Sequence, residues 1–136
     1  MRIFVLEDDL NRRQTMGEQL LPEDEVTTID TCTQAIKFQP PYDLVLLDHD
    51  LGGRQMEHHV DCGTVFVRMM LPELMRADVS RIVIHSYNPD GAARMARDLQ
   101  HRAHVYVAPF GGAEFWRHLT AAREASIITG PEGESM

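Results

Sequence analysis

Short runs of apolar residues alternate along the chain with longer segments that have helical periodicity. The continuous runs Ile3–Leu6, Leu44–Leu47 and Arg81–Ile84 are typical of strands in a parallel sheet that is buried on both faces. Shorter runs at Val26–Ile29 and Val105–Val107 predict two further strands. A helical segment follows each run, so the pattern predicts five successive βα units.

The segments between these runs carry signals for helices. Asp9 is a candidate N-cap for a helix over Leu10–Leu21, which Pro22 would help to end. A second helix face recurs at the spacing of helical turns in Cys62, Val65, Phe66, Met69 and Met70. Three more helical segments are expected. One is short, is capped by Thr31 or Thr33 and runs through Ala35, Ile36 and Phe38; the others run from an N-cap at Asp90 through Leu99 and over Ala113–Ala125.

Strict alternation of strands and helices calls for a parallel sheet with helices on both faces. Right-handed crossovers leave few topologies. We therefore predict an α/β, flavodoxin-like (βα)5 fold, with a doubly wound five-stranded parallel sheet in the order 2-1-3-4-5. The chain of 136 residues fits one domain over residues 1–125, followed by a flexible tail over residues 126–136.

Composition narrows the choice of partners. The chain has 13 Lys and Arg against 21 Asp and Glu, a formal net charge of −8, which argues against duplex DNA or an anionic membrane as the partner. No apolar run approaches the ~18 residues that a membrane span needs. The N-terminus begins with a strand-like run rather than a signal peptide, and Cys32 and Cys62 form no secreted disulfide pattern. We expect a cytoplasmic protein.

Acidic residues and histidines directly follow three of the predicted strands. Sites in such sheets lie outside the carboxyl ends of the strands, at the switch point between strands 1 and 3. Clustered carboxylates repel one another unless a cation lies among them, and Mg²⁺ prefers oxygen ligands. We expect Mg²⁺ (or Mn²⁺) at this edge, with its ligands drawn from Glu7, Asp8, Asp48 and Asp50. The alternative is that these acids are helix caps and a solvated rim, as we expect for Asp9.

Four stretches resemble the receiver domains of bacterial response regulators, over about residues 1–125. They are Met1–Asp9, Tyr42–Asp48, Ile82–Ser86 and Val105–Phe110. The resemblance puts Asp48 in the phosphoacceptor position and Ser86 in the position of a hydroxyl residue. Receivers carry a lysine just before the proline that follows strand 5, and this chain has Ala108 there. A missing cation should weaken phosphoryl stabilisation, which puts ordinary phosphorelay signalling in doubt.

Two further stretches, Asp48–Gly52 and His85–Pro89, resemble the receiver variant described as cyclic-phosphate-processing. The resemblance implies a metal-dependent phosphoesterase that acts on a phosphate-containing small molecule or an RNA end. His49 or His85 would serve as general acid or base, since imidazole titrates near neutral pH. The expected site is catalytic Asp48, His49, His85 and Ser86, with substrate contacts from Arg54, Ser86 and Asn88.

Non-catalytic roles remain open for His49 and His85. His49 could orient Asp48 or face solvent, and His85 could be hydrogen-bonded to a neighbouring carboxylate. Two other functions also stay open for the whole chain. One is a phosphoacceptor receiver of a two-component-type system. The other is a degenerate receiver that binds a protein partner through the predicted fourth helix, fifth strand and last helix, where the acidic charge would suit a basic partner.

Overall fold

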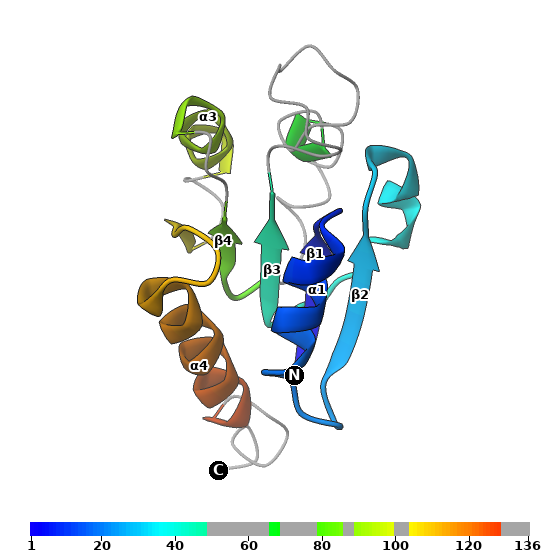
Figure 1. Ribbon diagram of the computed structural model, residues 1–136, viewed down its shortest axis with the longest axis vertical. Coiled ribbons are helices and arrows are strands. Elements are labelled where there is room, and N and C mark those ends of the chain that lie inside the picture. The colour runs from blue at the N-terminus through cyan, green and yellow to red at the C-terminus, as the bar shows by residue number, and fades with distance from the viewer. Residues whose placement is uncertain (49–65, 69–78, 86–88, 100–103, 129–136) are drawn as a thin grey trace.

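The computed structural model describes residues 1–48, 66–68, 79–85, 89–99 and 104–128. Five strands form one parallel sheet in the order β2-β1-β3-β4-β5 (Figure 1). The strands are β1 (Arg2–Leu6), β2 (Glu25–Ile29), β3 (Leu44–Leu47), β4 (Ile82–Ile84) and β5 (Val105–Val107). The predicted flavodoxin-like topology is confirmed.

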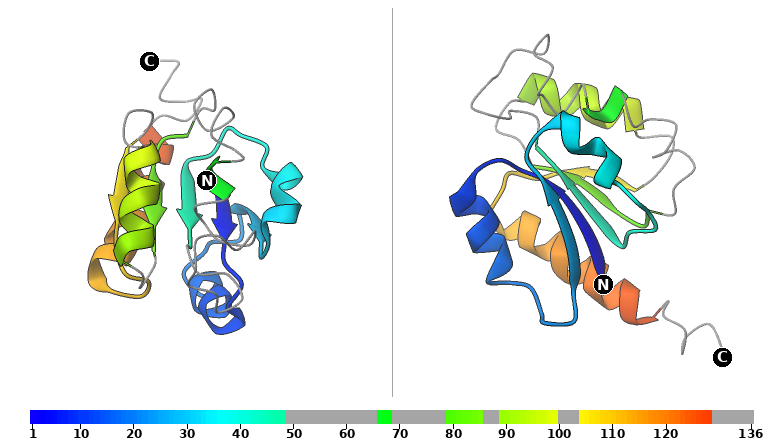
Figure 2. Two further views of the ribbon diagram at one scale, coloured as in Figure 1. Left: turned by 90° about the horizontal axis from the view of Figure 1, so that it is seen from above. Right: turned by 90° about the vertical axis from the view of Figure 1, so that its right-hand side faces the viewer.

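Helices lie on both faces of this sheet. They are α1 (Leu10–Gly17), the 3-10 helix η1 (Cys32–Lys37), α3 (Pro89–Leu99) and α4 (Ala113–Ile128). Figure 2 shows α1 and α4 on one face of the sheet, with η1 and α3 on the other. No helix in the described part of the chain is both long enough and apolar enough to span a membrane.

Alternating side chains of the strands form two separate cores, as the pleat of a strand requires. In β1, Phe4 and Leu6 belong to the core under α3, whereas Ile3 and Val5 belong to the core under α1 and α4. The first core is rich in aromatic rings, and the ring of Phe4 lies 4.9 Å from that of Phe38. Burial on both faces explains why the central strands β3 and β4 contain only apolar residues.

The first helix is shorter than predicted. α1 ends at Gly17 rather than near Leu21, because glycine favours helix poorly and because the next residues form a turn. The carboxylate of Asp24 accepts the backbone N–H of Leu21 at 2.8 Å and so stabilises that turn. Within the predicted segment Met16 is buried, whereas Leu10 is 73% and Leu21 44% exposed.

Two other helix boundaries differ from the predicted ones. α3 begins at Pro89, so Asp90 lies inside its first turn rather than at the N-cap; the fixed φ of proline suits a first helical position. α4 continues past Ala125 to Ile128, because no glycine or proline occurs before Gly130. Residues 129–136 of the predicted tail lie outside the described residues, as does most of the predicted helix face around Cys62.

Candidate functional site

Four residues form a row along the carboxyl edge of the sheet. The backbone N–H groups of Glu7, Asp48, His85 and Ala108 each donate to the last carbonyl of the neighbouring strand, at 2.9–3.1 Å. Each residue thus extends the hydrogen-bond ladder by one step beyond its strand. The row follows the strand order β1-β3-β4-β5, so Glu7, Asp48 and His85 are neighbours.

Three carboxylates come together at this edge, as the sequence predicts. Ligand oxygens of Glu7, Asp8 and Asp48 all lie within 4.8 Å of one another. Glu7 is fully buried, Asp48 is 3% exposed, and Asp8 is half-buried. Burying several acidic groups so closely is unfavourable unless positive charge or hydrogen-bond donors offset their repulsion.

Glu7 is incompletely satisfied. Its Oε2 accepts the backbone N–H of Asp9 at 3.1 Å. Its Oε1 is buried and has no hydrogen-bond partner among the residues that the structure describes. Burial raises the pKa of Glu7, although the Asp9 N–H and the charge of Arg12 oppose that rise. This carboxylate therefore has one buried oxygen that a bound cation would contact.

His85 is fully buried beside this carboxylate. Its Nδ1 lies 3.6 Å from Glu7 Oε1, and within the described ranges neither ring nitrogen has a hydrogen-bond partner. Its ring packs against Phe110 and Phe115, with ring centres 5.8 and 5.6 Å away. Burial, and secondarily the charge of Arg12, lowers the pKa of His85 to about 3. The imidazole is thus neutral at physiological pH, and its acid–base role stays a prediction.

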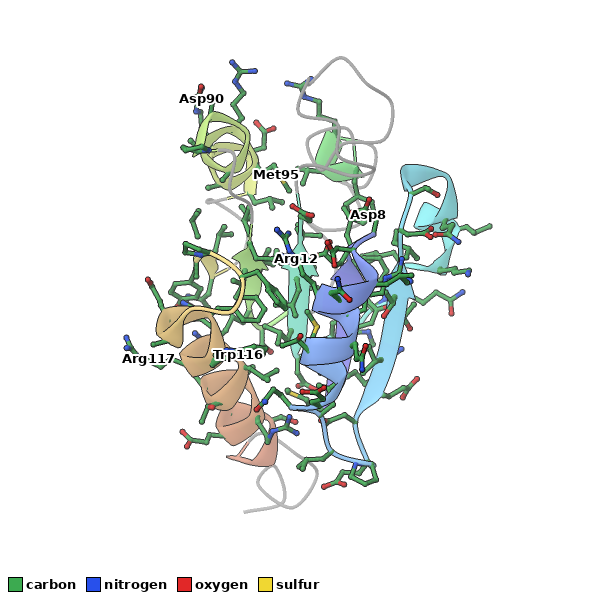
Figure 3. The ribbon with its side chains drawn as sticks, viewed as in Figure 1. Asp8, Arg12, Asp90, Met95, Trp116 and Arg117 are labelled. Atoms are coloured by element: carbon green, nitrogen blue, oxygen red, sulfur yellow. The ribbon has the colours of Figure 1, made fainter. Side chains whose placement is uncertain are left out.

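Arg12, on the first turn of α1, is a site residue that the sequence analysis missed. Its Nη1 lies 3.5 Å from Glu7 Oε1 and 3.6 Å from Asp48 Oδ2. Its guanidinium also lies 5.7 Å from the centre of the Phe110 ring. Figure 3 shows Arg12 and Asp8 at the same end of α1. Glu7 and Asp8 precede the helix that carries Arg12, so no helical spacing in the sequence signalled this contact.

Asp9 has the structural role predicted for it. It is the N-cap of α1, and its side chain accepts the backbone N–H of Arg12 at 3.0 Å. Of the consecutive acids Glu7, Asp8 and Asp9, the third is therefore a helix cap.

Five predicted site residues lie outside the described residues, and their roles stay predictions: His49, Asp50, Arg54, Ser86 and Asn88. Ala108, at the position where receivers carry a lysine, is among the residues that the structure describes. Ala108 is fully buried in the core under α1 and α4, so this position supplies no charge to the edge.

The three described carboxylates fit a hard divalent cation. Mg²⁺ takes oxygen ligands, usually one or two carboxylates with water completing the shell. Glu7 Oε1 is an independent indication, because within the described ranges it accepts no hydrogen bond, and a buried carboxylate oxygen without one is costly. Glu7, Asp8 and Asp48 are the residues that would hold such an ion.

Comparison with solved structures shows the same fold in response-regulator receivers. The response regulator TrrA from Thermotoga maritima in complex with Mg(2+)-BeF is 21% identical, with a TM-score of 0.60 over 89% of this chain and 97% of that one. The non-phosphorylated HemR receiver domain from Leptospira biflexa is 22% identical, with a TM-score of 0.63 over 89% and 92%.

A third similar structure is that of histidine kinase ThkA in complex with TrrA, at 23% identity and a TM-score of 0.58 over 89% of this chain and 97% of that one. A search of the curated proteins found no match. These likenesses show that the chain has the fold of response-regulator receiver domains.

A family model makes the assignment narrower. The model described as "Cyclic-phosphate processing Receiver domain" matches residues 1–101. The chain belongs to this family.

Proposed function

We propose that this receiver domain binds a divalent cation, Mg²⁺ or Mn²⁺, and processes a phosphate ester, with a cyclic phosphate end of a nucleotide or RNA as the substrate class. The observation that carries the proposal is the cluster of Glu7, Asp8 and Asp48, in which the buried Oε1 of Glu7 accepts no hydrogen bond from the residues that the structure describes. The description of the family supports the cyclic-phosphate part of the proposal.

The chain's own residues would divide the work as follows. Glu7, Asp8 and Asp48 supply described carboxylate oxygens to the cation, and Asp50 is proposed as a further ligand. When bound, such an ion offsets the carboxylate charge and polarises a phosphoryl oxygen. Ser86 and Asn88 are proposed to contact the substrate because of the resemblance, and Arg54 because a guanidinium suits a phosphate group.

We propose His49 rather than His85 as the residue that transfers a proton. A neutral ring with a pKa of about 3, enclosed by Phe110 and Phe115, is a weak base and a poorly accessible one. His85 can still accept or donate one hydrogen bond at Glu7 or at a ligand of the site, which would fix its tautomer. His85 would need Phe110 or Phe115 to move before it could reach a substrate.

A second candidate function is phosphorylation of Asp48. It is favoured by the likeness of the fold to TrrA in complex with Mg(2+)-BeF. Ala108 weakens this candidate because it adds no cation at the position that resembles the receiver lysine. A protein partner on α3, β5 and α4 is compatible with either function, and the TrrA relative is seen with a histidine kinase.

The test is a calorimetric titration of Mg²⁺ and Mn²⁺ into the wild type and into Asp48→Asn. We expect millimolar or tighter binding that falls at least about tenfold in the variant, because one of three carboxylates is lost. Asp98→Asn is the matched control: it removes the same charge from an exposed position on α3 and should bind as the wild type does.

Two assays then separate the candidate functions. Turnover of 2′,3′-cyclic nucleotides that Asp48→Asn abolishes supports the phosphoesterase. A mass gain after treatment with a small phosphodonor, absent in Asp48→Asn, supports phosphorylation instead. Wild-type protein that binds neither metal would rule out both.

A further inference from the structure

The position of Arg12 is unusual for a helix. A cationic side chain in the first turn of a helix opposes the helix dipole, and the acidic N-cap of α1, Asp9, lies just before that turn rather than in it. The sheet adds two further negative charges, since Glu7 and Asp48 lie 3.5 and 3.6 Å from the Arg12 guanidinium. The fold thus places this charge at the carboxyl edge for an electrostatic reason.

Neither of these contacts is a tight hydrogen bond. Charge-assisted N–H···O bonds are usually about 2.7–2.9 Å long, and both separations are well beyond that. The side chain is 27% exposed, whereas the side chains of Glu7 and Asp48 are 0% and 4% exposed. The guanidinium thus lies on the outer side of the carboxylates and is open to solvent on part of its surface.

An aromatic ring supports the guanidinium at this place. Phe110 lies 5.7 Å from Arg12 Cζ, within the range of a cation–π contact. Phe110 in turn packs against Phe115 and Trp116, at ring-centre distances of 4.9 and 5.8 Å. Packing on this ring thus helps to hold the arginine beside the site.

We propose that Arg12 is the cation of this site that contacts the phosphoryl oxygens of the ligand. The inference rests on the proposed function. Without a metal, Arg12 balances the charge of Glu7 and Asp48; once a metal neutralises these carboxylates, its planar fork turns to the phosphoryl group. A guanidinium suits this task because its N–H donors match two phosphoryl oxygens at once. It would thereby supply from α1 the charge that Ala108 does not supply from β5.

The test compares Arg12→Gln with the wild type in two titrations. The first is Mg²⁺ alone, and we expect the variant to bind it about threefold to tenfold more tightly, because a competing positive charge is gone. The second uses an anion at saturating Mg²⁺, and we expect the variant to bind it about tenfold or more weakly. Opposite changes are the signature, since a merely structural role for Arg12 would weaken both.

Two anions distinguish the source of the phosphoryl group. Beryllofluoride stands for a group carried by Asp48, and 2′,3′-cyclic AMP stands for a bound ester. Weakening in either arm supports the proposal and identifies the source. Arg12→Lys keeps the charge without the fork, so it should bind Mg²⁺ as the wild type does and the anion more weakly. Arg117→Gln on α4, distant from Arg12 in Figure 3, removes the same charge and should change neither titration.

The outcomes separate this inference from the proposed function. Wild-type protein that fails to bind Mg²⁺ overturns both. Wild-type protein that binds Mg²⁺ and an anion, with both affinities unchanged in Arg12→Gln, overturns the role of Arg12 alone. Wild-type protein that binds Mg²⁺ but neither anion also overturns it.

Discussion

Two buried carboxylates at opposite edges of the sheet differ in how well they are satisfied. Asp24, just before β2, accepts three donors: the N-terminal amine at 3.0 Å, the Leu21 N–H at 2.8 Å and Arg123 Nη1 at 2.7 Å. Glu7, just after β1, accepts the N–H of Asp9, and its Oε1 lacks a hydrogen-bond partner in the part of the chain that the structure describes.

The pKa values of the two groups move in opposite directions for this reason. Burial tends to raise the pKa of Asp24, but hydrogen bonds from Leu21, Arg123 and the N-terminus outweigh it and lower that pKa. At Glu7 burial dominates and the pKa is raised. The hydrogen bonds of Asp24 stabilise the fold, whereas the Glu7 oxygen without a hydrogen bond is the one that we propose contacts a cation.

Exchanging the carboxylate for an amide at each place tests this difference most strongly. Asp24→Asn puts an amide among three donors and should lower the free energy of unfolding by about 2–4 kcal/mol. Glu7→Gln removes a costly buried charge and should change it by less than about 1 kcal/mol. Urea unfolding at pH 7 with a chelator measures both. Equal losses at the two positions would contradict the comparison.

The pH dependence of stability sharpens the contrast at the carboxyl edge. The pKa of His85 is lowered to about 3, whereas an unfolded histidine titrates near 6.5. The unfolded state therefore binds more protons between these values, and stability falls as the pH falls through this window. At pH 5 this costs the wild type about 2 kcal/mol relative to pH 8.

His85→Leu should lack that loss, since leucine does not titrate. The measurement is the difference in unfolding free energy between variant and wild type at pH 8 and pH 5. His104→Gln, which removes an exposed imidazole, is the control. Parallel pH profiles for His85→Leu and the wild type would show that the ring is not buried as described.

Asp9 tests whether neighbouring acids have separate roles. Asp9→Ala removes the N-cap of α1 and should lower the free energy of unfolding by about 1 kcal/mol. Its Mg²⁺ affinity should stay within about twofold of the wild type, because Asp9 is a cap and not one of the three clustered carboxylates. A tenfold loss of Mg²⁺ affinity, measured by calorimetry, would place Asp9 among the ligands.

The sequence predicts the central strands well because β1, β3 and β4 are buried on both faces. A short, continuous apolar run such as Leu44–Leu47 is typical of a central strand in a parallel sheet. The end of α1 could not be predicted in the same way, since it depends on the side chain of Asp24, which no periodicity shows. α4 continues to Ile128, beyond its predicted end at Ala125, because no helix-breaking residue follows Ala125 directly. The composition of the following residues was a weaker signal than this absence of a breaker.

The candidate site is predictable as far as it follows from topology. The rule that the carboxyl ends of parallel strands meet at one edge is enough to bring Glu7, Asp8 and Asp48 together. The position of Arg12 and the enclosure of His85 depend instead on how α1 and Phe110 pack over that edge. Such contacts between distant segments have no signature in a single sequence.

The pairing of β1 with β3 has a consequence for how this chain can change in length. Leu6 pairs with Leu47, and Glu7 and Asp48 each follow their strand by one residue, so the strand register makes these two acids neighbours. Deleting or inserting one residue inside either strand would exchange its two faces and carry the acid out of line with its neighbour. Connections on the surface tolerate such changes far better. Insertions and deletions should therefore accumulate in the connections of this family and spare β1 and β3.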